Sequence, residues 1–374
     1  MAARSRSLLR GAALLCVVAA GDSLSAHRVA HGPLGRVVSR HALRARALGM
    51  VQLEAKALTL SNWLEDLGNP GLARTLEAIF SSAAEVAGKI RTSSCDSVEG
   101  CFNTLGALDD EQFAIDLLAN EVMYERLSSA GTVATISSTQ DPYEIPIGGR
   151  GFSVAFDPLD SAASVDVNFA VGSSWGVWTG SKLTGIKGRD LAAAGLTIYG
   201  PRTAMLVATG ARAGVDEFVL TDAIDGVWQW VVSNRFETID EDQPFRRAIF
   251  APGNLRATAG NAGYRELIDF YIERCYHLRY SGGMVPDVLQ LVIKGRGIFA
   301  NPDGGAPAPA RIRLLYEAAP AAFVIEKAGG ASTDGASSLL DVVVQDTDQR
   351  TQVALGSKLE VARFDATVGP AKRA

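Results

Sequence analysis

Apolar residues recur at helical spacing through much of the chain. Between residues 53 and 92 they appear every three or four positions, and the pattern breaks at Gly68-Asn-Pro-Gly71. This periodicity predicts two helices joined by a turn, because glycine and proline interrupt helices. Further helices are expected at 111–129, 263–274, 285–294 and 312–328.

Shorter apolar runs predict strands between these helices. The clearest is Gly151–Asp157, and others are expected at 169–178, 195–198, 204–209 and 217–220. Strands and helices interleave along the chain, which is typical of a layered α/β protein. There is no internal repeat. We expect a boundary in the polar loop near residue 240, which would divide 51–240 from 241–374.

The first 50 residues follow a different pattern. Three arginines precede an apolar stretch at 11–20, and the small residues Ser25 and Ala26 follow, which is the order of a secretory signal. Residues 27–50 are rich in Arg and His and lack acids, as transit peptides do. Together the two segments predict a bipartite leader that directs the chain to a plastid bounded by more than two membranes. A plain mitochondrial or chloroplast leader is the alternative.

Composition and charge exclude several classes of function. The chain has 374 residues, 47% of them hydrophobic, and a net charge of −5; beyond residue 50 it carries 28 basic and 40 acidic residues, or −12. Without basic runs, nucleic acid is not an expected partner. The longest uncharged apolar run has 11 residues, against about 20 needed to span a membrane. His277 is the only histidine beyond residue 50, which argues against a histidine triad or a His-rich metal site.

Two carboxylates close the buried strand in the sequence Phe156-Asp157-Pro-Leu-Asp160. The proline stiffens the turn, so both side chains and the intervening Leu159 carbonyl can aim at one point. Such an all-oxygen set suits Mg²⁺ or Mn²⁺. A turn capped by an Asp side chain is the alternative.

Three more acids extend this candidate site. Asp110 and Asp116 lie at the start of the helix before the strand, and Asp116 is expected to point inward, whereas Asp110 could equally be a helix N-cap. Glu317 stands in an otherwise apolar helix and needs a partner or a metal. A salt bridge to Arg313 is the alternative for Glu317.

From about residue 56 to 368 the chain resembles the fructose/sedoheptulose bisphosphatase family, and within it the sedoheptulose branch found in plastids. The resemblance rests on several motifs in the same order. They are Phe156–Asp160, Lys182–Gly185, Gly188–Asp190, Ile198–Thr203, Pro252–Thr258, Leu278–Asp287, Arg313–Glu317 and Glu326–Gly330.

The resemblance implies a layered α/β/α/β/α sandwich of the sugar-phosphatase superfamily. It also implies Mg²⁺-dependent hydrolysis of the 1-phosphate of sedoheptulose 1,7-bisphosphate in the Calvin cycle, with fructose 1,6-bisphosphate as the alternative substrate. Asp157, Leu159, Asp160 and Glu317 match the family's metal ligands. Asp160 is also expected to act in catalysis, together with Asp110 and Asp116, which match the carboxylates that position metal and water.

The resemblance further implies how the second phosphate is held and where the protein works. Asn254, Arg279, Tyr280 and Arg311 match its binding residues, and Arg311 replaces the usual lysine. By the same resemblance we expect a homodimer in the chloroplast stroma. Two or more Mg²⁺ sites are typical of the family.

The chain departs from the family at two places. The family has Ser-Glu-Glu where this chain has Ser138-Thr-Gln140, so both glutamates are missing, although Asp141 and Glu144 lie nearby in the sequence. It has Gly-Ser-Ser where this chain has Ser161-Ala-Ala163. If that glycine needs a positive φ, Ser161 is strained by about 1–2 kcal/mol. These losses leave open a catalytically impaired paralogue that binds sugar phosphates without turnover.

The cysteines suggest redox control. Cys16 falls in the leader, and Cys275 is expected to be a solitary core thiol. Cys95 and Cys101 do not have the spacing of a zinc site. The related plastid enzyme has a cysteine pair here, with one residue fewer between, that thioredoxin reduces, so the resemblance implies a redox switch; two free thiols are the alternative.

Overall fold

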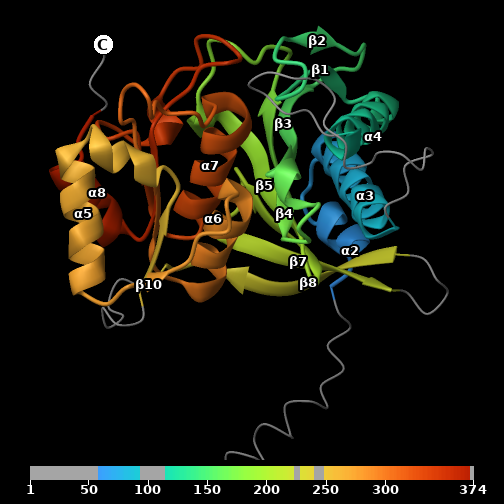
Figure 1. Ribbon diagram of the computed structural model, residues 1–374. Helices are drawn as coiled ribbons and strands as arrows, with labels where there is room; N and C mark the ends of the chain where they lie inside the picture. The colour runs from blue at the N-terminus through green and yellow to red at the C-terminus, as the bar shows by residue number, and fades with distance from the viewer. Residues whose placement is uncertain (1–57, 93–113, 223–227, 240–247, 371–374) are drawn as a thin grey trace, which may run out of the picture. The chain divides into compact units, whose positions relative to one another are not determined.

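A computed structural model describes residues 58–92, 114–222, 228–239 and 248–370, all within one compact unit, residues 55–374 (Figure 1). The predicted break between the first two helices is confirmed: α2 is Leu60–Glu65 and α3 is Pro70–Thr92. Pro70 occupies the first helical position, where its missing N–H costs nothing. The Asn69 side chain accepts a hydrogen bond from the Leu72 N–H at 3.0 Å and so caps α3.

A large sheet follows, with the strand order β2-β1-β3-β4-β5-β6-β7-β8. Its strands are β1 (Val133–Ser138), β2 (Ile145–Pro146), β3 (Phe152–Asp160), β4 (Val171–Thr179), β5 (Leu191–Tyr199), β6 (Thr203–Thr209), β7 (Val215–Asp222) and β8 (Trp228–Phe236). β1 and β3 run parallel, and β4 pairs antiparallel to β3. The predicted strand at 151–157 is the buried β3.

A second sheet of five short strands has the order β10-β9-β11-β13-β12. Its strands are β9 (Ile249–Pro252), β10 (His277–Leu278), β11 (Ile298–Asn301), β12 (Ala331–Thr333) and β13 (Val353–Gly356). The other helices are α4 (Ala114–Ala130), α5 (Ala262–Glu273), α6 (Met284–Lys294), α7 (Ala319–Lys327) and α8 (Lys358–Thr367). Among the described residues, no helix is both long and apolar enough to cross a membrane.

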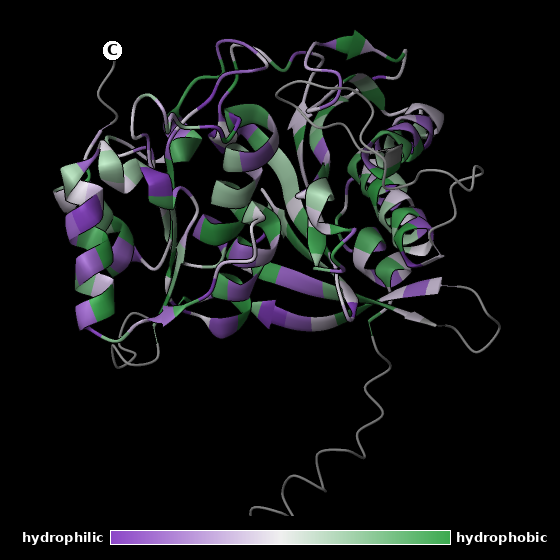
Figure 2. Cartoon of the chain, in the orientation of Figure 1, coloured by the Kyte–Doolittle hydropathy of each residue, from purple (hydrophilic) through white to green (hydrophobic). Residues whose placement is uncertain are grey.

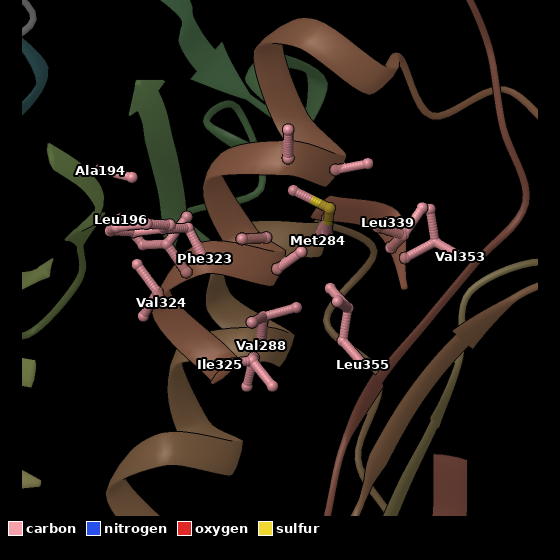
Figure 3. Packing of buried hydrophobic residues seen from close by; sticks show 14 of the residues in the cluster. Ala194, Leu196, Met284, Val288, Phe323, Val324, Ile325, Leu339, Val353 and Leu355 are labelled. Atoms are coloured by element: carbon pink, nitrogen blue, oxygen red, sulfur yellow. The ribbon is translucent and has the colours of Figure 1, made fainter. Parts of the chain in front are cut away.

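Three hydrophobic clusters define five layers. The first joins α2, α3 and α4 to one face of the large sheet, and the second fills the space around α6 and α7 between the two sheets (Figure 3). The third joins the outer face of the small sheet to α5 and α8. Figure 2 shows hydrophilic and hydrophobic residues alternating along α5, as expected of a helix with one buried face. The layered α/β/α/β/α expectation is confirmed.

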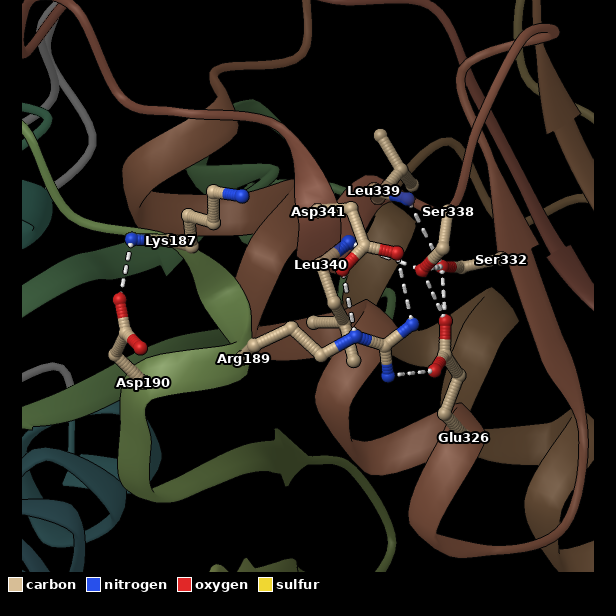
Figure 4. Close-up of polar contacts among 9 residues, drawn as sticks. All are labelled: Lys187, Arg189, Asp190, Glu326, Ser332, Ser338, Leu339, Leu340 and Asp341. Atoms are coloured by element: carbon tan, nitrogen blue, oxygen red, sulfur yellow. Dashed lines mark hydrogen bonds and ion pairs between the residues drawn. The ribbon is translucent and has the colours of Figure 1, made fainter.

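A polar cluster ties the large sheet to α7 (Figure 4). Arg189 precedes β5, and its guanidinium donates to both carboxylate oxygens of Asp341, at 2.8 and 3.1 Å. It also donates to Glu326 near the end of α7, at 2.8 Å. Ser332 and Ser338 donate to the other oxygen of Glu326. The forked geometry of arginine suits two carboxylates at once.

We expect Arg189→Met to lower the free energy of unfolding by about 1–2 kcal/mol, because Glu326 and Asp341 both lose their cation. Arg189→Lys should recover less than half of the loss, since lysine cannot form the fork. Arg126→Met is the matched control, because Arg126 makes a single exposed pair with Glu85 at 2.8 Å. Thermal unfolding measures the effect, and equal losses in Arg189→Met and Arg126→Met would contradict it.

Candidate active site

The turn that closes β3 is held by its neighbours in the sheet. The pairing of β3 with β4 becomes irregular between Asp157 and Asp160, where β3 accommodates one extra residue. The Ser173 hydroxyl donates to the Pro158 carbonyl at 2.7 Å, which fixes the turn from β4. Asp157 also accepts the Leu159 N–H at 3.3 Å, so the side-chain cap considered from the sequence is present alongside the convergence of carboxylates.

Asp160 lies against the start of α6. Its Oδ2 atom accepts the Val285 N–H at 2.6 Å, and its Oδ1 atom accepts the Ser161 hydroxyl at 3.3 Å. A free N–H in the first turn of a helix favours a carboxylate. Burial, followed by the charge of the neighbouring Asp157, nevertheless raises the pKa of Asp160 to about 7.

Glu317 enters the site from a π-helical turn, η6 (Leu314–Ala318), that leads into α7. Its Oε2 atom accepts the backbone N–H of Arg313 at 2.7 Å, while the Arg313 guanidinium pairs with Asp348 at 2.6 Å. The salt bridge considered for Glu317 is therefore replaced by a backbone contact, and Arg313 is engaged elsewhere. Burial raises the pKa of Glu317 to about 8, with Asp157 as the next cause.

Asp116 sits in the first turn of α4 and is buried, as the sequence predicts. Its Oδ2 atom accepts a short hydrogen bond from the Gln140 amide, and its Oδ1 atom is buried without a partner among the described residues. Burial raises its pKa to about 8, and the charges of Asp157 and Asp160 add to the rise.

These four carboxylates form one electrostatic unit, because the pKa shifts show that Asp157 and Asp160 act on both Asp116 and Glu317. The donor set is all oxygen, and one buried oxygen is unpartnered, which fits a hard divalent cation. As arranged, however, no three acidic, His or Cys side chains of the described residues stand close enough to hold an ion. Hydrogen bonds from the protein hold the carboxylates instead.

Thr139 and Gln140 follow β1 and face this unit. The Thr139 N–H donates to the Phe156 carbonyl, and the Thr139 hydroxyl donates to Asp157 at 3.0 Å. Gln140 donates to Asp116. Two neutral donors thus occupy the positions where the family pattern has acids.

The two acids nearest in sequence point elsewhere. Asp141 accepts the Asn120 amide at 2.9 Å, and Glu144 accepts the N–H groups of Leu183 and Thr184 at 2.8 and 2.9 Å. In this arrangement neither side chain takes the place of the missing glutamates.

Ser161 adopts the left-handed conformation, with φ 65° and ψ 37°. The position therefore has the positive φ that the sequence comparison raised as a source of strain. Serine carries a side chain there, whereas glycine would adopt this conformation without strain.

We expect the free energy of unfolding of Ser161→Gly to exceed that of Ser161→Ala by about 1 kcal/mol. Alanine keeps the backbone strain and removes only the hydroxyl. Comparing these two variants isolates the backbone from the weak contact with Asp160. Chemical denaturation measures the difference. If glycine were no more stable than alanine, the strain would be absorbed by the surrounding turn.

The residues expected to hold the second phosphate lie around the small sheet. Arg279 and Arg311 are exposed, and the Tyr280 hydroxyl donates to the Gly253 carbonyl at 3.0 Å, next to Asn254. Asn254 is buried, and its amide donates to the carbonyls of Pro302 and Ala308 at 3.0 and 3.1 Å. The Asn254 amide hydrogens therefore hold the 302–308 segment, so only the side-chain oxygen could contact a phosphate-bearing ligand, and only through a donor on that ligand.

Three expected site residues, Asp110, Cys95 and Cys101, lie outside the described residues. Cys275 was expected in the core, and this is wrong. It is exposed, with φ 57°, directly after the C-cap of α5, where the chain turns out of the helix. A residue with positive φ commonly follows the C-cap, where the chain leaves the helix, and here the Cys275 thiol lies near the carbonyl of Glu273 at the helix end.

Backbone N–H donors at the site were not predicted from the sequence, which indicated only the Leu159 carbonyl among the backbone groups. The Val285 and Arg313 N–H groups hold Asp160 and Glu317, and side-chain patterns carry no signal for such contacts. Asp287 was also missed: it is buried and accepts the Ser281 N–H at 3.0 Å, which shapes the segment before α6. The sequence signals a close approach of this segment to another part of the chain only through the paired glycines Gly282 and Gly283. In the structure Gly283 packs against Ser161.

Two adjoining stretches match descriptions of known families. Residues 58–233 match "Fructose-1-6-bisphosphatase, N-terminal domain" and residues 244–369 match "Fructose-1-6-bisphosphatase, C-terminal domain". Among similar curated proteins, chloroplastic sedoheptulose-1,7-bisphosphatase of Spinacia oleracea is 46% identical over 80% of this chain and 74% of its own length. That of Chlamydomonas reinhardtii is 43% identical over 81% and 75%.

Solved structures agree. A candidate sedoheptulose-1,7-bisphosphatase from Toxoplasma gondii has a TM-score of 0.73 and 30% identity, covering 83% of this chain and 98% of that one. Leishmania major fructose-1,6-bisphosphatase has a TM-score of 0.74 and 27% identity, covering 83% and 99%. The two family matches cover every described carboxylate of the site, and together with the relatives they confirm the resemblance seen in the motifs. The chain belongs to the fructose-1,6-bisphosphatase family.

Proposed function

We propose that this protein is a sugar bisphosphatase that hydrolyses the 1-phosphate of sedoheptulose 1,7-bisphosphate. The observation that carries the proposal is that Asp116, Asp157, Asp160 and Glu317 lie near enough to one another for the charges of Asp157 and Asp160 to raise the pKa values of the other two. The identity of 43–46% to proteins named as sedoheptulose-1,7-bisphosphatases supports the choice of substrate.

Mg²⁺ is the proposed cofactor, held by Asp157, Asp160, Glu317 and the Leu159 carbonyl. A bound divalent cation stabilises charge on a phosphate and lowers the pKa of water. Asp116, and Asp110 by resemblance, would orient the attacking water and accept its proton. The Val285 N–H and the Thr139 hydroxyl keep Asp160 and Asp157 aimed at the site.

The 51–240 part would supply most of the metal site, and the 241–374 part the sugar-phosphate site. Arg279, Tyr280, Arg311 and Asn254 would hold the second phosphate, with local positive charge offsetting the acidic surroundings. The names of the relatives support a plastid location for this chain, reached through the leader at 1–50. A homodimer and regulation by thioredoxin through Cys95 and Cys101 remain part of the proposal.

Two alternatives compete with this function. Fructose 1,6-bisphosphate is one, since bacterial fructose-1,6-bisphosphatases are 34% identical to this chain. The other is binding of sugar phosphates without turnover. It is favoured by the neutral Thr139 and Gln140 at the carboxylates and by the strained Ser161.

One experiment separates the three. The reduced protein, residues 51–374, is given each bisphosphate while Mg²⁺ is titrated into the high millimolar range, and both phosphate release and sugar binding are measured. Faster release from the seven-carbon substrate supports the proposal. Equal or faster release from the six-carbon substrate rejects the sedoheptulose assignment, and binding without release identifies a non-catalytic binder.

A further inference from the structure

Two hydrogen bonds distinguish the carboxylate site of this chain. The Thr139 hydroxyl donates to Asp157 at 3.0 Å, and the Gln140 amide donates to Asp116. Both donors come from the segment directly after β1, and both acceptors are carboxylates, which carry negative charge when they are ionised. Hydrogen bonds to charged groups are about twice as strong as those between neutral groups.

These donors act where the electrostatic strain is greatest. Loss of solvent opposes the charged form of Asp116, Asp157 and Asp160. The charge of Asp157 also opposes that of Asp160, and both oppose that of Asp116. A bound cation would relieve such repulsion, and donors supplied by the protein relieve part of it without one. The Gln140 bond lowers the free energy of an Asp116 carboxylate that would otherwise have two unpartnered oxygens.

We propose that Thr139 and Gln140 are positioning residues that organise the carboxylate site before a divalent cation binds. The hydrogen bonds stabilise the cation-free form more than the cation-bound form, because a cation takes over the same carboxylate charges. This inference rests on the proposed function only in assuming that a divalent cation binds these carboxylates. It implies that the two donors weaken cation binding and, in return, keep the site ordered when no cation is bound.

The test uses two isosteric variants and a matched control. Thr139→Val and Gln140→Met remove one donor each and keep side-chain volume. Asn120→Leu removes a comparable amide bond from α4 to Asp141, at 2.9 Å, which lies outside the carboxylate unit. Mg²⁺ binding is measured by calorimetry at one alkaline pH, and thermal unfolding is recorded with and without Mg²⁺, all in the absence of sugar.

We expect the Mg²⁺ dissociation constant to fall about tenfold in Thr139→Val, because its donor bonds the proposed ligand Asp157. In Gln140→Met it should fall about threefold, because Asp116 neighbours the proposed ligands without being one of them. Both variants should unfold at lower temperature without Mg²⁺ and regain most of the difference with it. Asn120→Leu should lose stability equally in both conditions. Unchanged or weaker Mg²⁺ binding in both donor variants would overturn the inference, because a purely structural role predicts no recovery.

The outcome is independent of turnover. If wild type releases phosphate while the donor variants leave Mg²⁺ affinity unchanged, the inference fails and the proposed function stands. If the donor variants tighten Mg²⁺ binding while wild type releases no phosphate, the inference stands and the proposed function fails.

Discussion

Asp157→Asn should abolish phosphate release and at the same time stabilise the cation-free protein. The asparagine oxygen can still accept the Thr139 hydroxyl and the Leu159 N–H, so the turn keeps its shape. One buried negative charge disappears from beside Asp160 and Glu317, whose pKa values it raises. We expect a loss in rate of about 10³-fold or more. The free energy of unfolding should rise by about 1–2 kcal/mol, because an unfavourable burial of charge is removed.

The control is a carboxylate equally buried in the same sheet but surrounded by donors. Asp216 accepts the Trp63 indole N–H at 2.9 Å and the Arg235 guanidinium at 3.0 Å. Asp216→Asn should cost about 2 kcal/mol and leave the rate per folded molecule unchanged. Thermal unfolding and phosphate release on both variants test the pair. A loss of stability in Asp157→Asn would contradict the prediction, because it would show that the hydrogen bonds to the charged Asp157 outweigh the cost of burying its charge.

Elements with strong local signals were predicted well from the sequence. The proline and glycine break before α3 and the apolar run of β3 are examples. The short strands of the second sheet were missed, because strands of two to four residues contain too few positions to show alternation. The expected helix at 312–328 begins instead as the π-helical turn that carries Glu317, a local variation without a periodic signature.

The sequence indicated the acidic side chains of the site and the Leu159 carbonyl, but not the backbone N–H groups that hold the carboxylates. Charged residues in apolar runs identify Asp157, Asp160 and Glu317, because burying them requires a function or a partner. The partners found are mostly N–H groups, such as those of Val285 and Arg313, and every residue type except proline carries one. Which N–H reaches which carboxylate depends on how α6 and η6 pack against β3, and no local pattern encodes that packing.

The second large effect is an inverted dependence of stability on pH. In the cation-free protein, burial raises the pKa of Asp157 to about 6, of Asp160 to about 7, and of Asp116 and Glu317 to about 8. Unfolded Asp and Glu titrate near pH 4. Between about pH 4 and 8 the folded state therefore binds more protons than the unfolded state. Stability should fall as the pH rises through this window and level off above it.

Mg²⁺ should oppose this fall in stability, because it binds the ionised carboxylates. For each proton that Mg²⁺ displaces, its affinity should rise about tenfold per pH unit. The measurement is thermal unfolding at several pH values, with chelator or with saturating Mg²⁺. If the cation-free protein became more stable from pH 5 to 8, the four carboxylates could not share one buried site. A fall with chelator that Mg²⁺ reverses would instead tie the cation to these carboxylates, because only groups that stay protonated in the cation-free fold release protons when it binds.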